Sequence, residues 1–185
     1  MTKTRNPARG APAATPCPWE DIADDGSNLS VDMLPSVPFV RLADLFRRKV
    51  TAPYANLHDL TVPQWRMLAL MDHFSPIPFG MLVSFSGSDK ALVSRTVRQL
   101  EELGLAAVLP DAQGNKKKLT CAITPEGEAI CRELMPIAQQ RAARLLNGLS
   151  RAERVTLHAV LGKLEALIEA LPPLGPESGA DEDQD

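Results

Sequence analysis

A helix predicted over residues 89–103 carries the side chains best suited to binding a polyanion. Val93, Val97 and Leu100 recur at spacings of four and three residues, so they share the face that turns toward a core. Small and basic residues occupy the rest of the helix, where a hydroxyl can donate to phosphate, an arginine can pair with guanine and a leucine can touch a thymine methyl group. The candidate contacts with double-stranded DNA here are Ser88, Lys90, Ala91, Leu92, Ser94, Arg95 and Arg98.

A basic turn follows this helix. Two short apolar runs, residues 105–109 and 119–123, flank a turn rich in Pro, Gly and Asn, which predicts a β-hairpin. A flexible basic tip suits phosphates or a minor groove. Two arginines on a helix are also typical of a solvent-exposed face, and lysines in a turn also prevent a strand edge from pairing with another chain. Found together, the basic helix and the basic turn favour DNA binding. The candidate contacts at the tip are Asn115, Lys116, Lys117 and Lys118.

Further helices must position these groups. Thr61 and Gln64 have the spacing of a capping box that opens a helix through Asp72, and a short helix is predicted over residues 78–85 after a proline-rich break at 75–78. Three helices followed by a hairpin are typical of a winged helix-turn-helix. The predicted fold class is therefore mainly α with a small β wing (α+β), with the DNA-binding lobe in residues 61–124.

Long helices flank this lobe. One is predicted over residues 36–52, ended by Pro53; another runs from Thr124-Pro125 to about residue 146, with a bend at Pro136; a third starts at a capping box at Ser150. The last helix carries an apolar stripe too wide for the DNA-binding lobe to cover, so residues 35–56 and 125–171 are predicted to form a homodimer, an intramolecular three-helix bundle being the alternative. The stripe consists of Leu157, Leu161, Leu164, Ile168 and Leu171.

The composition of the two ends of the chain indicates that residues 35–171 form the single folded domain. The 185 residues carry a net charge of −3, yet residues 172–185 hold five acidic side chains and no basic one, so the charge between the ends is positive. Residues 1–34 and this acidic tail are expected to be disordered. Three cysteines without framework spacing, and no apolar stretch suited to a bilayer or a secretory signal, predict a cytoplasmic protein.

Four motifs extend the pattern to a family. They are Leu-Thr-Val-Pro-Gln-Trp-Arg-Met-Leu at 60–68, Ser-Gly-Ser-Asp-Lys-Ala-Leu-Val-Ser-Arg at 86–95, Leu-Glu-Glu-Leu-Gly-Leu at 100–105 and Leu-Thr-Cys-Ala-Ile-Thr-Pro-Glu-Gly at 119–127. Together they resemble the MarR family of bacterial transcription regulators over residues 36–171. The resemblance implies a homodimer on a palindromic operator, usually a repressor released by a small aromatic or phenolic ligand. Where that family commonly has Asp-Arg-Arg at the wing tip, this chain has Asn115-Lys116-Lys117, which suits phosphates rather than bases.

The resemblance also implies a ligand pocket where the first, second and fifth helices of the family meet the DNA-binding lobe. A ligand that prefers a wider spacing of the DNA-reading helices would lower operator affinity through a population shift. An apolar or aromatic stripe can equally be plain core. The candidate pocket residues are Phe39, Phe46, His58, Trp65, Arg66, Met71 and Met135.

The same sequence bears on other classes of function. An enzyme, a metal site and a bound cofactor are not expected, because no His, Cys and Asp cluster has ligand spacing and no Gly-rich phosphate loop or Ser elbow occurs. A thiol-based redox-sensing regulator of the same fold, acting through Cys17, Cys121 or Cys131, is one alternative. A helical interaction module that does not bind DNA is the other, and its binding would lack a steep salt dependence.

Overall fold

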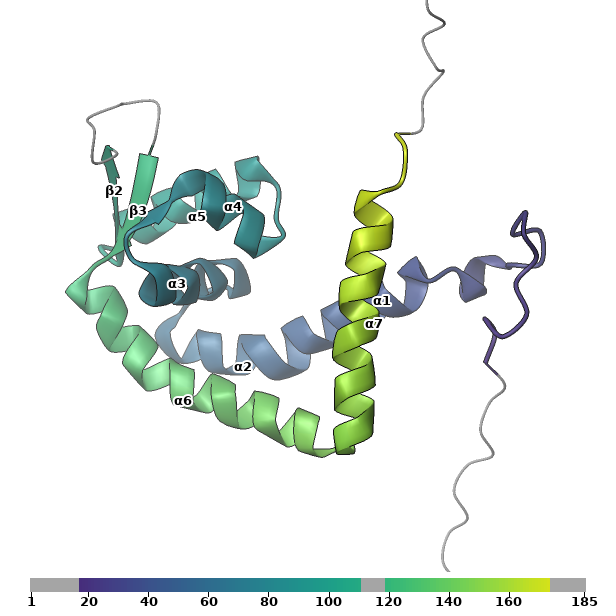
Figure 1. Cartoon of the computed structure of the whole chain (residues 1–185). Coiled ribbons are helices and arrows are strands. Elements are labelled where there is room, and N and C mark those ends of the chain that lie inside the picture. Colours follow the sequence, from purple (N-terminus) through teal and green to yellow (C-terminus); the bar gives the residue numbers. More distant parts are fainter. Residues whose placement is uncertain (1–16, 111–118, 174–185) are drawn as a thin grey trace, which may run out of the picture. The chain divides into compact units, whose positions relative to one another are not determined.

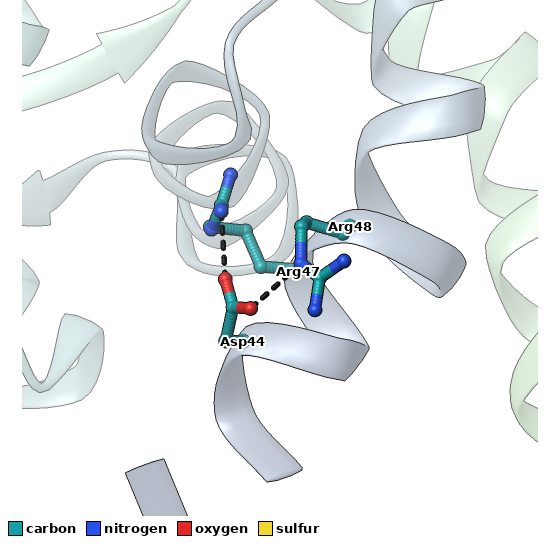
Figure 2. Close-up of polar contacts among 3 residues, drawn as sticks. All are labelled: Asp44, Arg47 and Arg48. Atoms are coloured by element: carbon teal, nitrogen blue, oxygen red, sulfur yellow. Dashed lines mark hydrogen bonds and ion pairs between the residues drawn. The ribbon is translucent and has the colours of Figure 1, made fainter. Parts of the chain in front are cut away.

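The structure is a computed structural model that describes residues 17–110 and 119–173. The chain divides into two units, Met1–Pro53 and Tyr54–Asp185, so the division falls inside the predicted domain. The first unit contains the 3₁₀ helix η1 (Val31–Met33), the helix α1 (Ser36–Leu45) and the π-helix η2 (Phe46–Thr51). Within it, the carboxylate of Asp44 lies between two guanidinium groups, at 2.7 Å from Arg47 Nη2 and 2.6 Å from Arg48 Nε (Figure 2). Hydrogen bonds from Arg47 and Arg48 hold the pKa of Asp44 below its usual value.

Two expectations for this part of the chain differ from the structure. Residues 17–34 were expected to be disordered, but they form hydrogen-bonded turns, and the Trp19 indole N–H donates to the Met33 carbonyl at 2.6 Å. The predicted helix end at Pro53 is wrong, because the π-helix leads directly into α2 (Ala52–Ala55) and η3 (Asn56–His58). The wider π turn before Pro53 relieves the clash that a proline ring makes with the preceding turn of an α-helix.

The predicted three helices and hairpin are present in the second unit (Figure 1). They are α3 (Val62–Phe74), α4 (Phe79–Ser86), α5 (Lys90–Glu102), β2 (Ala106–Pro110) and β3 (Leu119–Ile123). The predicted capping box opens α3: the Thr61 N–H donates to Gln64 Oε1 at 2.8 Å, and the Gln64 N–H donates to Thr61 Oγ1 at 3.4 Å. The fold class, mainly helical with a small β wing, is confirmed.

The sheet has one more strand than the sequence predicted. Residues 75–78 were interpreted as a break, but Ile77–Pro78 form β1, and the strand order is β1-β3-β2 with both pairs antiparallel. Cys121 at the centre of β3 lies opposite Ile77 on one side and Val108 on the other. A two-residue strand has no alternation to detect, and its pairing partner is more than 40 residues away in the sequence.

The core of the second unit joins all of these elements. Side chains from α3, α4, α5, the sheet and the following helix are almost fully buried together, and this packing supplies most of the driving force for folding. The largest fully buried members are Leu60, Met67, Leu68, Met71, Ile77, Leu82, Leu100 and Leu134.

Two long helices complete the second unit: α6 (Pro125–Asn147) and α7 (Arg151–Glu169). Both begin at the predicted caps, since the Gly127 N–H donates to Thr124 Oγ1 at 3.1 Å and the Ser150 N–H donates to Glu153 Oε2 at 2.7 Å. Pro136 lies inside α6, which remains one helix. No helix in the described part of the chain is both long and apolar enough to cross a lipid bilayer.

Candidate nucleic-acid interface

Helix α5 separates a buried face from a basic one. Its N-cap is Asp89, whose carboxylate accepts from the Leu92 N–H at 2.8 Å. Val93, Val97 and Leu100 are buried as predicted. The periodicity argument therefore places the helix correctly, with its remaining surface directed to solvent.

The predicted contact residues on α5 lie on that remaining surface. Lys90, Ala91, Ser94, Arg95 and Arg98 are exposed. Within residues 17–110 and 119–173, no ion pair involves any of these cations. Their charges are therefore available to an external anion such as a phosphate.

The other two predicted contacts of this region are half-buried: Leu92 on the helix and Ser88 in the turn before it. The Ser88 hydroxyl donates to the Ser86 carbonyl at 3.4 Å, and the Ser88 N–H donates to Ser86 Oγ at 3.1 Å. Ser88 thus shapes the turn that leads into α5. The predicted tip contacts Asn115, Lys116, Lys117 and Lys118 lie outside the described residues.

Two residues of α5 were missed by the sequence argument. Thr96 is buried, and its hydroxyl donates to the Leu92 carbonyl at 2.8 Å, a common bond for a threonine four residues along a helix. Glu101 reaches the hairpin, where its Oε1 accepts from the Val108 N–H at 2.9 Å. An acid at the end of a basic helix, just before a hairpin, is the sequence signal that could have identified it.

The predicted ligand-pocket residues have different surroundings. Trp65 and Met71 are buried in the core, and the Trp65 indole N–H donates to the Tyr54 hydroxyl at 3.1 Å with the two rings edge to face. Phe39 and Phe46, in the first unit, are each 42% exposed. Trp65 and Met71 are therefore part of the packed core, and their place in a ligand pocket stays a prediction.

The remaining pocket candidates lie near the surface of the second unit. His58 Nε2 is 3.0 Å from Glu133 Oε2, which links η3 to α6, and Arg66 is exposed on α3. Met135 lines a shallow cavity of about 280 Å³ between α3 and α6. The other lining residues of this cavity are Asp72, Glu128, Cys131 and Arg132.

The cysteines differ sharply in accessibility. Cys17 is exposed, whereas Cys121 and Cys131 are buried. Burial, followed by the charge of Glu101, raises the pKa of Cys121 to about 11. Burial, followed by the charges of Asp72 and Glu128, raises the pKa of Cys131 to about 12. The two buried thiols stay protonated near neutral pH and do not supply the thiolate that redox chemistry requires.

The predicted dimerisation stripe is open to solvent in the single chain. None of the residues of α7 is buried. Leu157, Leu161 and Ile168 are exposed, Leu164 is half-buried, and Leu171 is exposed just beyond the end of the helix.

Known proteins resemble this chain in sequence and in structure. Residues 58–115 match the model of the MarR family. No curated protein matches the chain. A crystal structure of a MarR/EmrR family transcriptional regulator from Acinetobacter sp. ADP1 is similar to this chain, with 24% identity, a TM-score of 0.69 and coverage of 77% of this chain and 100% of that one.

Two further solved structures carry information about ligands. A complex of MepR from S. aureus with DNA shares 19% identity and a TM-score of 0.65, covering 71% of this chain and 96% of that one. BpsR from Bordetella bronchiseptica, whose DNA binding is regulated by 6-hydroxynicotinic acid, shares 22% identity and a TM-score of 0.62, covering 75% and 98%. The resemblance to the MarR family is therefore confirmed: residues 58–115 match the family, and the chain has the winged helix-turn-helix fold of MarR regulators.

Proposed function

We propose that this chain is a transcription regulator that binds a palindromic DNA operator as a homodimer and is released by a small aromatic acid or phenol. The observation that carries the proposal is the division of α5 into a buried apolar face and an exposed face with Ser94, Arg95 and Arg98. A helix of this kind lies in a major groove in winged helix-turn-helix proteins, with hydroxyls and guanidinium groups toward phosphates and base edges. The structure of MepR in complex with DNA, a protein similar in fold, supports DNA binding by this chain.

Charge reversal on α5 tests DNA binding. Operator sequences are first selected from random duplex DNA with the wild-type protein. The double variant Arg95→Glu/Arg98→Glu should then bind the selected duplex at least 100-fold more weakly, because in each subunit of the dimer it replaces two attractions to phosphate with two repulsions. In the simpler variant Arg95→Ala/Arg98→Ala, the homodimer loses four phosphate contacts, two from each subunit. The magnitude of the slope of log affinity against log salt concentration should therefore fall by about 3.6, since each lost phosphate contact removes about 0.9.

A matched control separates local contacts from net charge. Arg144→Glu/Arg151→Glu makes the same change in charge at exposed positions on α6 and α7, away from α5. Because both positions lie in the segment predicted to form the homodimer, sedimentation must first show that this control pairs as the wild type does; it should then bind the operator nearly as the wild type does. Equal affinities of the two charge-reversal variants, or selection of no sequence at all, would contradict the proposal.

The homodimer is proposed from the exposed apolar surface. The stripe on α7 is open in the single chain, and α1 also exposes Val37, Val40 and Leu42. Monomeric proteins rarely leave apolar patches of this extent on the surface, so a second copy is the natural cover. A two-fold dimer would place the two α5 helices about one DNA turn apart, which is the spacing of half-sites that a palindrome requires.

Sedimentation of two single variants tests the dimer. Leu161→Asp puts a charge in the stripe, whereas Val155→Asp puts one on the opposite side of α7, where the wild-type residue is 63% exposed. We expect two chains per particle for the wild type and Val155→Asp, and one for Leu161→Asp at micromolar concentration. A monomeric wild type would refute the dimer.

The effector is proposed from the regulation of BpsR by 6-hydroxynicotinic acid. Release requires that the ligand bind more tightly to the form with lower operator affinity. Titration of 6-hydroxynicotinate, and of phenolic acids of similar size, into the complex with the selected operator should lower the affinity for DNA with at least one of them. An operator affinity that no such compound changes would remove this part of the proposal.

A further inference from the structure

Glu101 makes a bond that joins α5 to the wing, which is defined here as β2 and β3. In the order β1-β3-β2, β2 is an edge strand, so every second N–H along it points away from β3. Val108 lies opposite Cys121, and its N–H donates outward to Glu101 Oε1 at 2.9 Å. The last turn of the DNA-reading helix is thereby tied to the middle of the wing's outer strand.

Other hydrogen bonds between the end of α5 and the wing lie nearer the base of the wing. The Leu105 N–H donates to the Leu100 carbonyl at 2.9 Å, and the Thr124 hydroxyl donates to the Gly104 carbonyl at 2.8 Å. These bonds fix the point where the chain leaves α5, and Gly104 takes a left-handed φ of +71° there. Val108 lies further along β2, so its hydrogen bond to Glu101 restrains the wing at a point farther from its base.

The negative charge of Glu101 is unfavourable for DNA binding at this place. It follows Arg98 by three residues on a helix whose exposed basic face is proposed to meet phosphates, and a free carboxylate there would repel DNA. A hydrogen bond to an ionised acceptor is about twice as strong as one between neutral groups, and a strand-edge N–H has no partner in the sheet.

We propose that Glu101 is a positioning residue that holds the wing at the angle to α5 required for both to engage one DNA duplex. The proposal rests on the DNA-binding function proposed above. It makes a prediction opposite to that of simple electrostatics. Removing an acid from a DNA-binding surface should strengthen binding, whereas releasing the wing should weaken it.

Three variants separate these effects. Glu101→Ala removes the acceptor, Glu101→Gln keeps an acceptor oxygen without the charge, and Glu102→Ala removes the neighbouring exposed acid, which makes no bond to another described residue. Amide exchange at Val108 in the absence of DNA, and affinity for the selected operator, are measured for each. We expect Glu101→Ala to speed the exchange of the Val108 amide at least 10-fold and to weaken operator binding about 10-fold.

The other two variants supply the controls. Glu101→Gln should restore most of both properties, and Glu102→Ala should leave Val108 exchange unchanged and bind the operator as tightly as the wild type or more tightly. Unchanged exchange at Val108 in Glu101→Ala would overturn the proposal, and so would operator binding by that variant as tight as that of Glu102→Ala. A wild type that binds no DNA would instead refute the proposed function, while the exchange measurement would still report whether Glu101 restrains the wing.

Discussion

Substituting Gly127 with alanine should destabilise the protein, although alanine is the better helix former. Gly127 lies in the first turn of α6, and a Cβ atom there would be 2.4 Å from the Leu105 carbonyl oxygen and 2.7 Å from Ile123 Cγ1. These atoms would have to move apart by about 1 Å to reach an ordinary van der Waals separation. The Leu105 oxygen cannot move freely, because it accepts from the Thr124 N–H at 3.2 Å.

The expected magnitude follows from two opposing effects. Inserting a methyl group into a well-packed site costs about 1–3 kcal/mol of unfolding free energy. Replacing glycine by alanine in a helix returns at most about 1 kcal/mol. We therefore expect a net loss of about 1–2 kcal/mol for Gly127→Ala, measured by urea unfolding at one fixed protein concentration.

Gly80→Ala is the matched control. Gly80 also lies in the first turn of a helix, α4, but an added Cβ would have no atom within 4 Å. This variant should be as stable as the wild type or more stable by up to about 1 kcal/mol. The packing argument fails if Gly127→Ala proves as stable as Gly80→Ala.

Two further predictions concern titratable groups. At pH 8 a thiol reagent should modify the exposed Cys17 rapidly and should react with Cys121 and Cys131 only after unfolding. The reason is that burial raises the pKa of Cys121 to about 11 and that of Cys131 to about 12. Rapid modification of more than one thiol in the folded protein would contradict the burial of Cys121 and Cys131. The hydrogen bonds from Ser150 hold the pKa of Glu153 below its usual value, so Ser150→Ala should raise that pKa in a carboxyl NMR titration. Because folding lowers the pKa of Glu153, the cap should stabilise the protein at a pH above the ordinary Glu pKa, and this contribution should be lost as the pH falls through the pKa of Glu153 in the folded protein. A difference in stability between Ser150→Ala and the wild type that grows toward low pH would contradict this prediction.

Local signals made most of the fold predictable. The capping boxes at Thr61 and Ser150 involve residues three positions apart, so the sequence alone marks where α3 and α7 begin. The buried face of α5 follows from the spacing of its apolar residues. Features that depend on distant residues were missed: β1 exists only through its pairing with β3, and the π-helix before Pro53 overrides a local stop signal.

The candidate site was also predictable where local sequence signals decide it, and not where distant residues do. Arg95 and Arg98 could be assigned to the exposed face from periodicity, but the bond between Glu101 and Val108 depends on how the hairpin folds back on the helix. Trp65 and Met71 have the composition of both a pocket wall and a core. Both residues are buried in the core of the second unit, and their role toward a ligand stays a prediction.

Both outer edges of the small sheet are protected against pairing with strands of other molecules. On one side β1 is two residues long and ends in Pro78, which has no N–H to offer an incoming strand. On the other side the outward N–H of Val108 is already occupied. Exposed strand edges are templates for aggregation, so this arrangement should help the protein to stay dispersed at high concentration.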